Sequence, residues 1–387
     1  MIDSKTQLEE LADSGIKTPA AAIRESNIEL FRIITMLLIV AHHYVVNSGL
    51  TAANGPIQAD PLSGRSIFLL LFGAWGKTGI NCFVMITGYF MCKSQITAKK
   101  FAKLFCEIMF YQIIFYLVFL LSGYEPFSLK TLAKALIPVT HINADFKNCF
   151  LLFWLFIPFL NILINNLNER QHIKLILLSS FLYVVLGTLH QVTMNYVSWF
   201  IVLYFIASYL RFYPKKCFDN TKMWGILAFC SVLISVISVV ACTWLGTKIH
   251  DRMYYAFVTD SNTFLAVTTG TFAFLFFKNI KMKYNKFINT VAASTFGVVL
   301  IHANSNAMRE WLWKDTLDNV GYYNSSIMPI HAIGSVICIF TVCVIIDIVR
   351  IKFLEKPFFA FWDKHWDGVA IKYKNWEDKV FKKLSVK

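Results

Sequence analysis

The stretch from residue 24 to residue 43, RESNIELFRIITMLLIVAHH, places three ionisable side chains where they could act together. Arg32 follows Glu29 by three positions, and His43 follows Arg32 by eleven. In a helix eleven positions make about 1100°, roughly 20° past three turns, so Arg32 and His43 project from one face. They lie about 16 Å apart along the axis. Such a face offers an anion-binding cation and, further along, an imidazole that can transfer a proton near neutral pH.

Glu29 shares this face and is close enough to Arg32 to pair with it and hold it in place. His42 is turned about 100° away from the face and is therefore predicted to be a packing or interface residue. A second interpretation of the same spacing remains open. In it, Glu29 and Arg32 form an ion pair at one membrane interface, and His43 is merely tolerated near the other.

The composition shows what kind of element carries these residues. Hydrophobic residues make up 57% of the 387 positions, charged residues only 16%, and the mean hydropathy is +0.55. Soluble domains contain about 25% charged residues, so an integral membrane protein is predicted. The nine cysteines form no C-x-x-C pair and no metal-ligand spacing, so they are read as small buried residues and no metal site is predicted.

An all-α fold follows, a polytopic membrane helix bundle with about ten transmembrane helices. The predicted spans lie near residues 28–48, 67–91, 101–122, 149–167, 173–190, 195–212, 223–247, 262–278, 290–309 and 328–352. A cytosolic tail is expected at 1–25, a transmembrane domain at 26–356 and a basic cytosolic tail at 357–387.

The distribution of basic residues predicts the orientation. Most of the 37 Lys and Arg fall in the tails and in the loops on the same side as the tails, so both termini are expected in the cytosol. The net charge of +14 is explained by this bias and by attraction to anionic lipid headgroups, and no nucleic-acid partner is expected. The polar first 27 residues do not read as a signal peptide.

Four blocks of sequence occur together in a recognisable order. They are the Glu29-x-x-Arg32-x10-His43 pattern, GKTGINCFVMITGYF at 76–90, STFGVVLIH at 294–302 and LEKPFF at 354–359. This set resembles the acyltransferase 3 family, integral membrane O-acetyltransferases of bacterial glycans. The predicted number of spans is similar to that of the family.

The resemblance implies an acyltransferase of the bacterial plasma (inner) membrane. It would move an acetyl group from cytosolic acetyl-CoA, its co-substrate, to a hydroxyl of an extracytoplasmic or lipid-linked polysaccharide, with no metal. Arg32 would hold a phosphate or the thioester, and Glu29 would hold Arg32. His43 would act either as a general base for the acceptor hydroxyl or as a nucleophile that carries the acetyl group.

Further residues of these blocks are secondary candidates. His302 lies in the middle of a predicted span and is either a second site residue or a satisfied core histidine. Tyr89 and Asn81, which stands where the family usually has Asp, are possible participants, and Glu355-Lys356-Pro357 is predicted to stop a helix. Lys100-x-x-Lys103, in place of the family's Arg-x-x-Arg, and Arg211 are candidate contacts for the CoA phosphates.

Two other functions compete with this interpretation. In a transporter or glycan exporter, intramembrane Glu, Arg and His would form a proton or substrate path. The Arg-x10-His pattern does not recur in a second half of the chain, which disfavours a transporter built from internal repeats. A non-catalytic partner of envelope enzymes is the third possibility. The sequence leaves open which glycan is modified and whether the acyl group is acetyl or longer.

Overall fold

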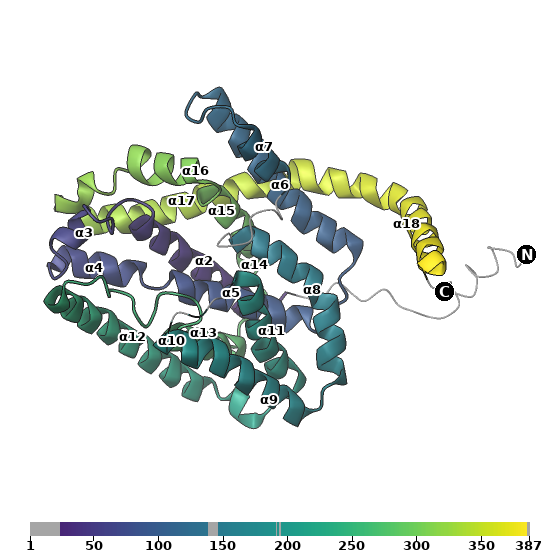
Figure 1. Cartoon of the computed structure of the whole chain (residues 1–387), viewed down its shortest axis with the longest axis horizontal. Helices are drawn as coiled ribbons and strands as arrows, with labels where there is room; N and C mark the ends of the chain where they lie inside the picture. The colour runs from purple at the N-terminus through teal and green to yellow at the C-terminus, as the bar shows by residue number, and fades with distance from the viewer. Residues whose placement is uncertain (1–23, 138–145, 191, 193–194, 385–387) are drawn as a thin grey trace, which may run out of the picture.

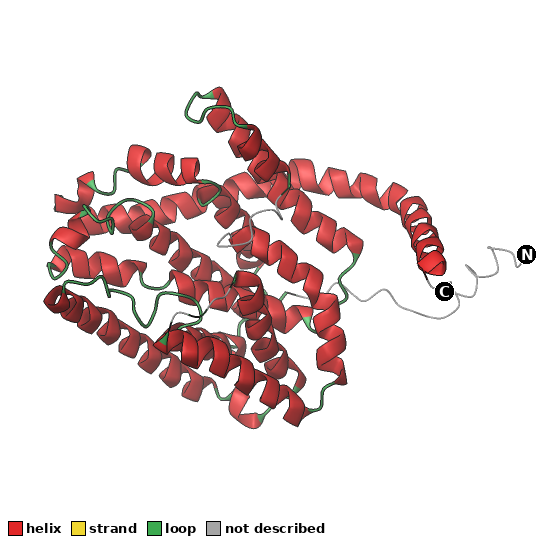
Figure 2. Cartoon of the chain, in the orientation of Figure 1, coloured by secondary structure: helices red, strands yellow, loops and turns green. Residues whose placement is uncertain are grey.

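Helices and short connecting loops make up the computed structural model, which describes residues 24–137, 146–190, 192 and 195–384 (Figures 1 and 2). No strand occurs within these ranges. The predicted all-α class is therefore confirmed.

The helices follow one another along the chain as α2 (Ser26–Val46), α3 (Pro56–Ala59), α4 (Gly64–Gly73), α5 (Gly76–Met91), α6 (Ala98–Leu121), α7 (Leu129–Leu136), α8 (Phe146–Asn166), α9 (Glu169–Ser180), α10 (Leu186–Leu189), α11 (Tyr196–Phe212), α12 (Thr221–Ile249), α13 (Phe264–Asn279), α14 (Lys286–Ala293), α15 (Thr295–His302), α16 (Asn306–Glu310), α17 (Met328–Arg350) and α18 (Lys356–Leu384). Short 3₁₀ or π turns lie at Phe181–Val185, Lys216–Asp219, Trp311–Thr316, Gly321–Asn324 and Ile351–Glu355.

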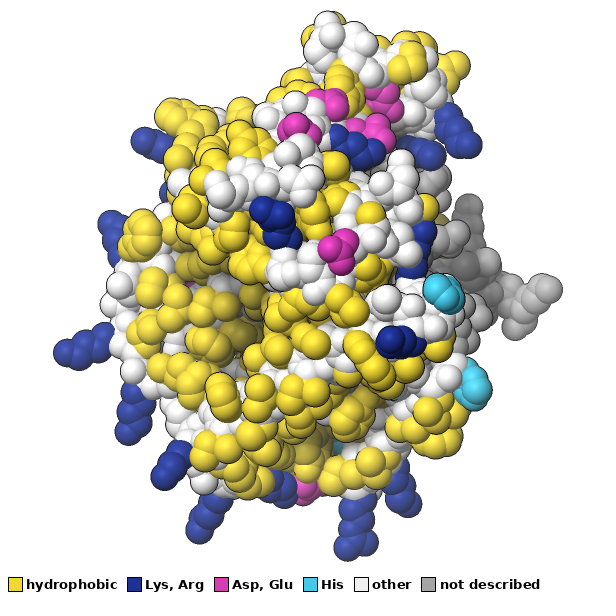
Figure 3. Space-filling view, turned by 90° about the vertical axis from the view of Figure 1, so that its left-hand side faces the viewer, with side chains coloured by type: hydrophobic (Ala, Val, Ile, Leu, Met, Phe, Trp, Pro, Cys, Tyr) yellow, Lys and Arg dark blue, Asp and Glu magenta, His cyan; other side chains and the backbone are white. Residues whose placement is uncertain are grey.

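Each of the ten predicted spans coincides with an apolar helical segment. Seven of these segments are long and apolar enough to cross a membrane by themselves, and an eighth qualifies if a bent pair of helices is taken as one span. The remaining two, α11 and α13, are shorter. Leu and Phe side chains project outward from peripheral helices such as α9 and α12, and hydrophobic side chains cover much of the face in Figure 3. An integral membrane protein accounts for this apolar exterior.

The bent pair corrects the predicted span at 290–309. The chain turns by 95° between Lys286–His302 and Asn306–Asn324, directly after His302. The amide of Asn304 donates to the Leu300 carbonyl at 2.9 Å, and the Ser305 hydroxyl accepts from the Met308 N–H at 3.1 Å. These two bonds satisfy backbone groups on both sides of the break, so the helix ends at His302 at little cost.

Helix α2 lies in the middle of the bundle and packs against α4, α5, α14 and α17 (Figure 1). Its approach to α5 requires glycine. A Cβ on Gly76 would lie 2.3 Å from the His42 side chain, and one on Gly79 would lie 2.9 Å from Ile39. Small residues at such contacts let two membrane helices pack closely.

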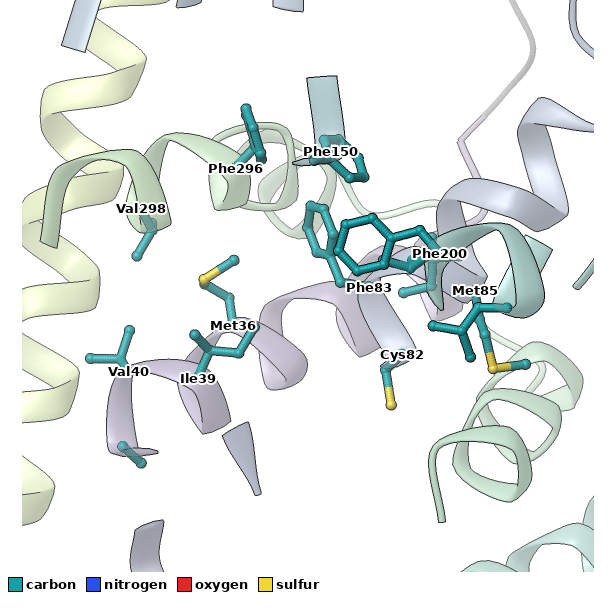
Figure 4. Close-up of a cluster of buried hydrophobic side chains, with 14 of the residues drawn as sticks. Met36, Ile39, Val40, Cys82, Phe83, Met85, Phe150, Phe200, Phe296 and Val298 are labelled. Atoms are coloured by element: carbon teal, nitrogen blue, oxygen red, sulfur yellow. The ribbon is translucent and has the colours of Figure 1, made fainter. Parts of the chain in front are cut away.

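An aromatic cluster lies among the buried hydrophobic side chains of the bundle (Figure 4). Phe83 of α5, Phe150 of α8, Phe200 of α11 and Phe296 of α15 meet there. Ring centroids are 5.7 Å apart for Phe83–Phe150 and 5.3 Å apart for Phe150–Phe296. Side chains from four helices far apart in sequence thus share one core, which fixes the helices that carry the candidate site.

The predicted helix stop at Glu355-Lys356-Pro357 is wrong. A π turn at Ile351–Glu355 leads directly into α18, which extends beyond the bundle in Figure 1. Proline lacks an N–H and is tolerated in the first turn of a helix. Pro357 stands second in α18, just after the π turn has shifted the hydrogen-bond register, so the helix passes through it.

Candidate functional site

Two histidines from different helices are hydrogen-bonded at the end of α2. Nδ1 of His302 lies 2.6 Å from the carbonyl oxygen of Val298, which only accepts, so this nitrogen carries the hydrogen. Nε2 of a neutral His302 is then an acceptor, and Nδ1 of His43, 2.9 Å away, donates to it. In this tautomer the hydrogen of His43 is on Nδ1 and the lone pair is on Nε2. No described residue forms a hydrogen bond with Nε2 of His43.

A cavity of about 200 Å³ gives access to His43. Its wall comes from α2, α5, α8, α11 and the α15–α16 break, and its polar lining includes Lys77, Lys147, Tyr196 and Arg309. We call it the His43 cavity. His302 itself is buried behind His43, with a relative exposure of 1%. The pair therefore consists of one accessible imidazole and one shielded imidazole that orients it.

His42 also borders this cavity but is engaged elsewhere. Its Nδ1 lies 2.6 Å from the carbonyl oxygen of Gly73, where α4 ends. Gly76, at the start of α5, packs directly on its side chain. His42 thus joins α2 to the α4–α5 junction, as the prediction of a packing residue requires.

Glu29 and Arg32 form the ion pair that their spacing predicts. Nε of Arg32 lies 3.7 Å from a carboxylate oxygen of Glu29, and Arg24 approaches the other oxygen at 4.0 Å. Glu29 is buried, whereas the Arg32 side chain has a relative solvent exposure of 22%. The Arg32 guanidinium also lies over the ring of Phe83, 6.0 Å from its centroid.

A chain of aromatic contacts leads from Arg32 to the wall of the His43 cavity. Phe83 contacts Arg32 and also packs edge-on against Phe146, with ring centroids 6.1 Å apart. Phe146 lines the His43 cavity, but Arg32 does not. The two ends of the predicted face therefore do not share one open cavity in this conformation.

Tyr89, a secondary candidate, and Arg211, a candidate contact for the CoA phosphates, are brought together. Nη1 of Arg211 donates to the Tyr89 hydroxyl at 2.9 Å, and the guanidinium lies 4.6 Å from the centre of that ring. Asn81 lies elsewhere and is fully buried. Its amide donates to the Ser261 carbonyl at 2.6 Å and accepts from the Trp199 indole at 2.9 Å, so it connects α5 to α11 and to the loop that precedes α13.

Lys100 and Lys103 have different surroundings. Nζ of Lys100 is exposed and contacts the Ser94 hydroxyl and the Gln95 carbonyl at 2.7 and 2.8 Å. Nζ of Lys103 lies 2.5 Å from the carboxylate of Glu355. Glu355 is thus part of an ion network and is not simply a helix end.

The centre of this network is Arg350, which the sequence analysis missed. Three of its nitrogens meet three carboxylates: Asp347 at 2.8 Å, Glu355 at 2.8 Å and Glu107 at 3.1 Å. The hydroxyl of Tyr111 donates to Asp347 at 2.8 Å. We call this set, with Lys103, the Arg350 network. An available signal was the i, i+3 spacing of Asp347 and Arg350 inside an apolar segment, the same signature that pointed to Glu29 and Arg32.

Sequence reasoning also missed the cavity roles of Lys77, Tyr196 and Arg309. Lys77 donates to the Tyr196 hydroxyl at 2.7 Å, which no sequence spacing foretells because the two residues come from α5 and α11. Arg309 reaches the cavity through the bend after His302. In the described part of the chain, no group of three or more His, Cys, Asp or Glu side chains could hold a metal ion.

The arrangement offers a proton acceptor in a cation-lined cavity at one end of α2 and a cation, Arg32, paired with Glu29 near the other. Among comparisons with known proteins, a family model described as an acyltransferase domain, acyltransferase 3, matches residues 25–354. No curated protein and no solved structure matches the chain. The matched range covers most of the 387 residues and includes all four blocks apart from the last five residues of the fourth. The chain therefore belongs to the acyltransferase 3 family, and it is a membrane acyltransferase.

Proposed function

We propose that this acyltransferase moves an acetyl group from cytosolic acetyl-CoA to a hydroxyl of an extracytoplasmic or lipid-linked polysaccharide. The observation that supports it most is the hydrogen-bonded chain from His43 through His302 to the Val298 carbonyl. This chain gives His43 the tautomer that a general base needs, with a lone pair on the accessible ring.

In the proposed reaction, Nε2 of His43 takes the proton of the acceptor hydroxyl while the oxygen attacks the thioester carbonyl carbon. The resulting tetrahedral intermediate collapses, the C–S bond breaks, and the departing thiolate takes the proton from Nε2. While His43 is protonated, its Nδ1–H remains bonded to Nε2 of His302, which disperses the positive charge. His302 is accordingly a positioning residue.

The donor is proposed to enter from the Arg32 end of α2. Acetyl-CoA carries its phosphates at one end of a long flexible arm and its thioester at the other. Such an arm suits a site in which the cation and the imidazole lie about 16 Å apart along one helix. Because Arg32 does not line the His43 cavity in this conformation, a passage between the two must open for the arm to reach His43.

Lys100, Lys103 and Arg211 are proposed to attract the CoA phosphates. Lys100 suits this role best because its ammonium is exposed and has only neutral partners among the described residues. Lys103 already pairs with Glu355. This arrangement presumes both termini in the cytosol and a location in the bacterial inner membrane, which the basic loops and apolar helices support.

The test is transfer of labelled acetyl from acetyl-CoA to surface glycan in membranes that contain equal amounts of each variant. His43→Ala is expected to lower the rate by about 10²–10⁴, the usual contribution of a positioned general base. His42→Ala is the matched control and should keep much more activity, with a loss of stability instead. Equal activity of the two variants, or glycan movement without any labelled product, would reject the proposal.

The same preparation separates the two roles open to His43. Incubation with labelled acetyl-CoA and no acceptor, followed by denaturation, should leave no label on the protein if His43 is a base. Label that wild type retains and His43→Ala lacks would instead identify a covalent acetyl relay.

A further inference from the structure

The polar lining of the His43 cavity is strongly basic. Lys77 of α5, Lys147 of α8 and Arg309 of α16 all border it, and none of the described residues that line it is Asp or Glu. In low-dielectric walls, charges of one sign create a potential that draws in the opposite charge. The cavity therefore favours an anion next to His43.

The contacts of Lys77 and Arg309 sharpen this conclusion. Lys77 donates to the Tyr196 hydroxyl at 2.7 Å, and Nη1 of Arg309 lies 3.3 Å from the Asn306 side-chain oxygen. Both partners are neutral, and Nε of Arg309 is buried without a hydrogen bond. Lys147 donates to the Asn304 carbonyl at 2.6 Å and is held in place at the cavity wall.

Three cations elsewhere in the bundle are paired with carboxylates. Arg32 pairs with Glu29, Lys103 with Glu355, and Arg350 with three carboxylates. Half-burying a cation without a counter-ion costs free energy, so a cavity with Lys77 and Arg309 in this state is arranged for an incoming anion.

We infer that the acceptor carries a phosphate or carboxylate group close to the hydroxyl that is acetylated, and that Lys77 and Arg309 bind this group. The inference rests on the proposed function, in which the His43 cavity receives the acceptor. The planar guanidinium of Arg309 suits either oxyanion, since both offer paired oxygens to its fork, and Lys77 adds a point charge. A uronic acid and a sugar phosphate are the two sources of this chemistry.

The experiment compares three acceptors with the full-length protein in membranes: a trisaccharide with one glucuronate, its neutral methyl ester, and the same trisaccharide carrying a phosphate in place of the carboxylate. The wild type is expected to show a KM at least tenfold lower for one or both anions than for the ester, weakening as salt is raised. Preference for the glucuronate identifies a uronic acid as the source, and preference for the phosphate identifies a sugar phosphate.

Lys77→Gln and Arg309→Gln should each raise the KM for the preferred anion about tenfold more than the KM for the ester. Lys314→Gln is the control: Lys314 lies on the same segment as Arg309 but pairs with Glu310 and does not line the cavity. No preference for the anions, or an effect of Lys77→Gln and Arg309→Gln on the KM for acetyl-CoA alone, overturns the inference. The second result would place the donor phosphates in this cavity.

Failure of the proposed function gives a different pattern, because no acceptor then yields a labelled product. The binding of the anions is still measurable without turnover, as the shift in melting temperature that each trisaccharide produces. A shift with an anion that the ester does not give, and that Arg309→Gln removes, supports the anion site. Equal shifts with all three trisaccharides reject it.

Discussion

The His43 cavity and the Arg350 network both gather charged and titratable side chains inside an apolar bundle. The two regions differ in whether the cations have carboxylate partners. In the Arg350 network each of three guanidinium nitrogens meets a different carboxylate, and Asp347 also accepts from Tyr111. In the His43 cavity Lys77 and Arg309 meet neutral oxygens, and Nε2 of His43 has no described partner. Ion pairing of the first kind holds helices together, whereas the second kind leaves groups available to a substrate.

The two regions are joined through α15. A Cβ on Gly297 would lie 2.4 Å from the Asp347 carboxyl group, so α15 rests directly on α17 at the network. His302 ends the same short helix. The network therefore fixes the helix whose His302 orients the His43 imidazole, without itself facing the cavity.

The largest expected difference between the two regions is in stability. Arg350→Ala leaves Glu107, Asp347 and Glu355 buried without their cation and should destabilise the protein by about 3–5 kcal/mol. Arg309→Ala, the matched change in the cavity, removes a cation that has no carboxylate partner among the described residues and should cost less than about 1 kcal/mol. The melting temperature of each variant in detergent measures this difference. Equal decreases in melting temperature for the two variants would show that the two regions contribute equally to stability.

The next effect concerns orientation within the cavity. His302→Ala removes the acceptor for Nδ1–H of His43 and frees the ring to adopt the other tautomer. The kcat for acetyl transfer should fall roughly 10- to 100-fold, less than for loss of the base itself. The KM for acetyl-CoA should change little, and the pH profile of kcat should shift because His302 no longer shares the charge. A lower yield of folded protein with normal kcat would make His302 a core residue only.

Which of these features the sequence could predict depends on the range of the contact. Helical spacing predicted the Glu29–Arg32 pair, and the shared face singled out His43 over His42. The apolar runs located the membrane helices because hydropathy is a property of a single segment. The same local reasoning would have found Asp347 and Arg350.

Contacts between distant helices were beyond that reasoning. His43 and His302 are 259 positions apart, and only the packing of α15 against α2 brings Nδ1 to Nε2. The bend after His302 depends on Asn304 and Ser305, whose side chains form hydrogen bonds with backbone groups on the two sides of the break. A hydropathy average over a whole span does not detect two such residues. The helix stop predicted from Pro357 was wrong for a related reason, because the π turn at Ile351–Glu355 shifts the hydrogen-bond register just before the proline.

A smaller effect is expected at the other end of the predicted face. Arg32→Lys keeps the charge beside Glu29 but loses the planar fork, so the KM for acetyl-CoA should rise about tenfold if the guanidinium contacts a phosphate or the thioester. The KM for the acceptor should not change, because Arg32 does not line the His43 cavity. Glu29→Gln is the companion variant and should produce a weaker effect in the same direction. A change in the acceptor KM alone would place both ends of the face in one site.

The smallest expected effect separates Lys100 from Lys103, which the sequence placed in one motif. Lys100→Glu reverses an exposed charge that has no carboxylate partner among the described residues, so it should raise the KM for acetyl-CoA severalfold and make it more sensitive to salt. Lys103 already neutralises part of the Glu355 charge, and its side chain is 55% exposed. Lys103→Gln should therefore alter the KM less and cost at most about 1 kcal/mol of stability.

Steady-state kinetics at two salt concentrations, with both variants at equal amounts in membranes, measures the contrast. An unchanged KM for Lys100→Glu would assign this lysine to membrane topology alone, and a larger effect at Lys103 would mean that the edge of the Arg350 network takes part in binding the donor.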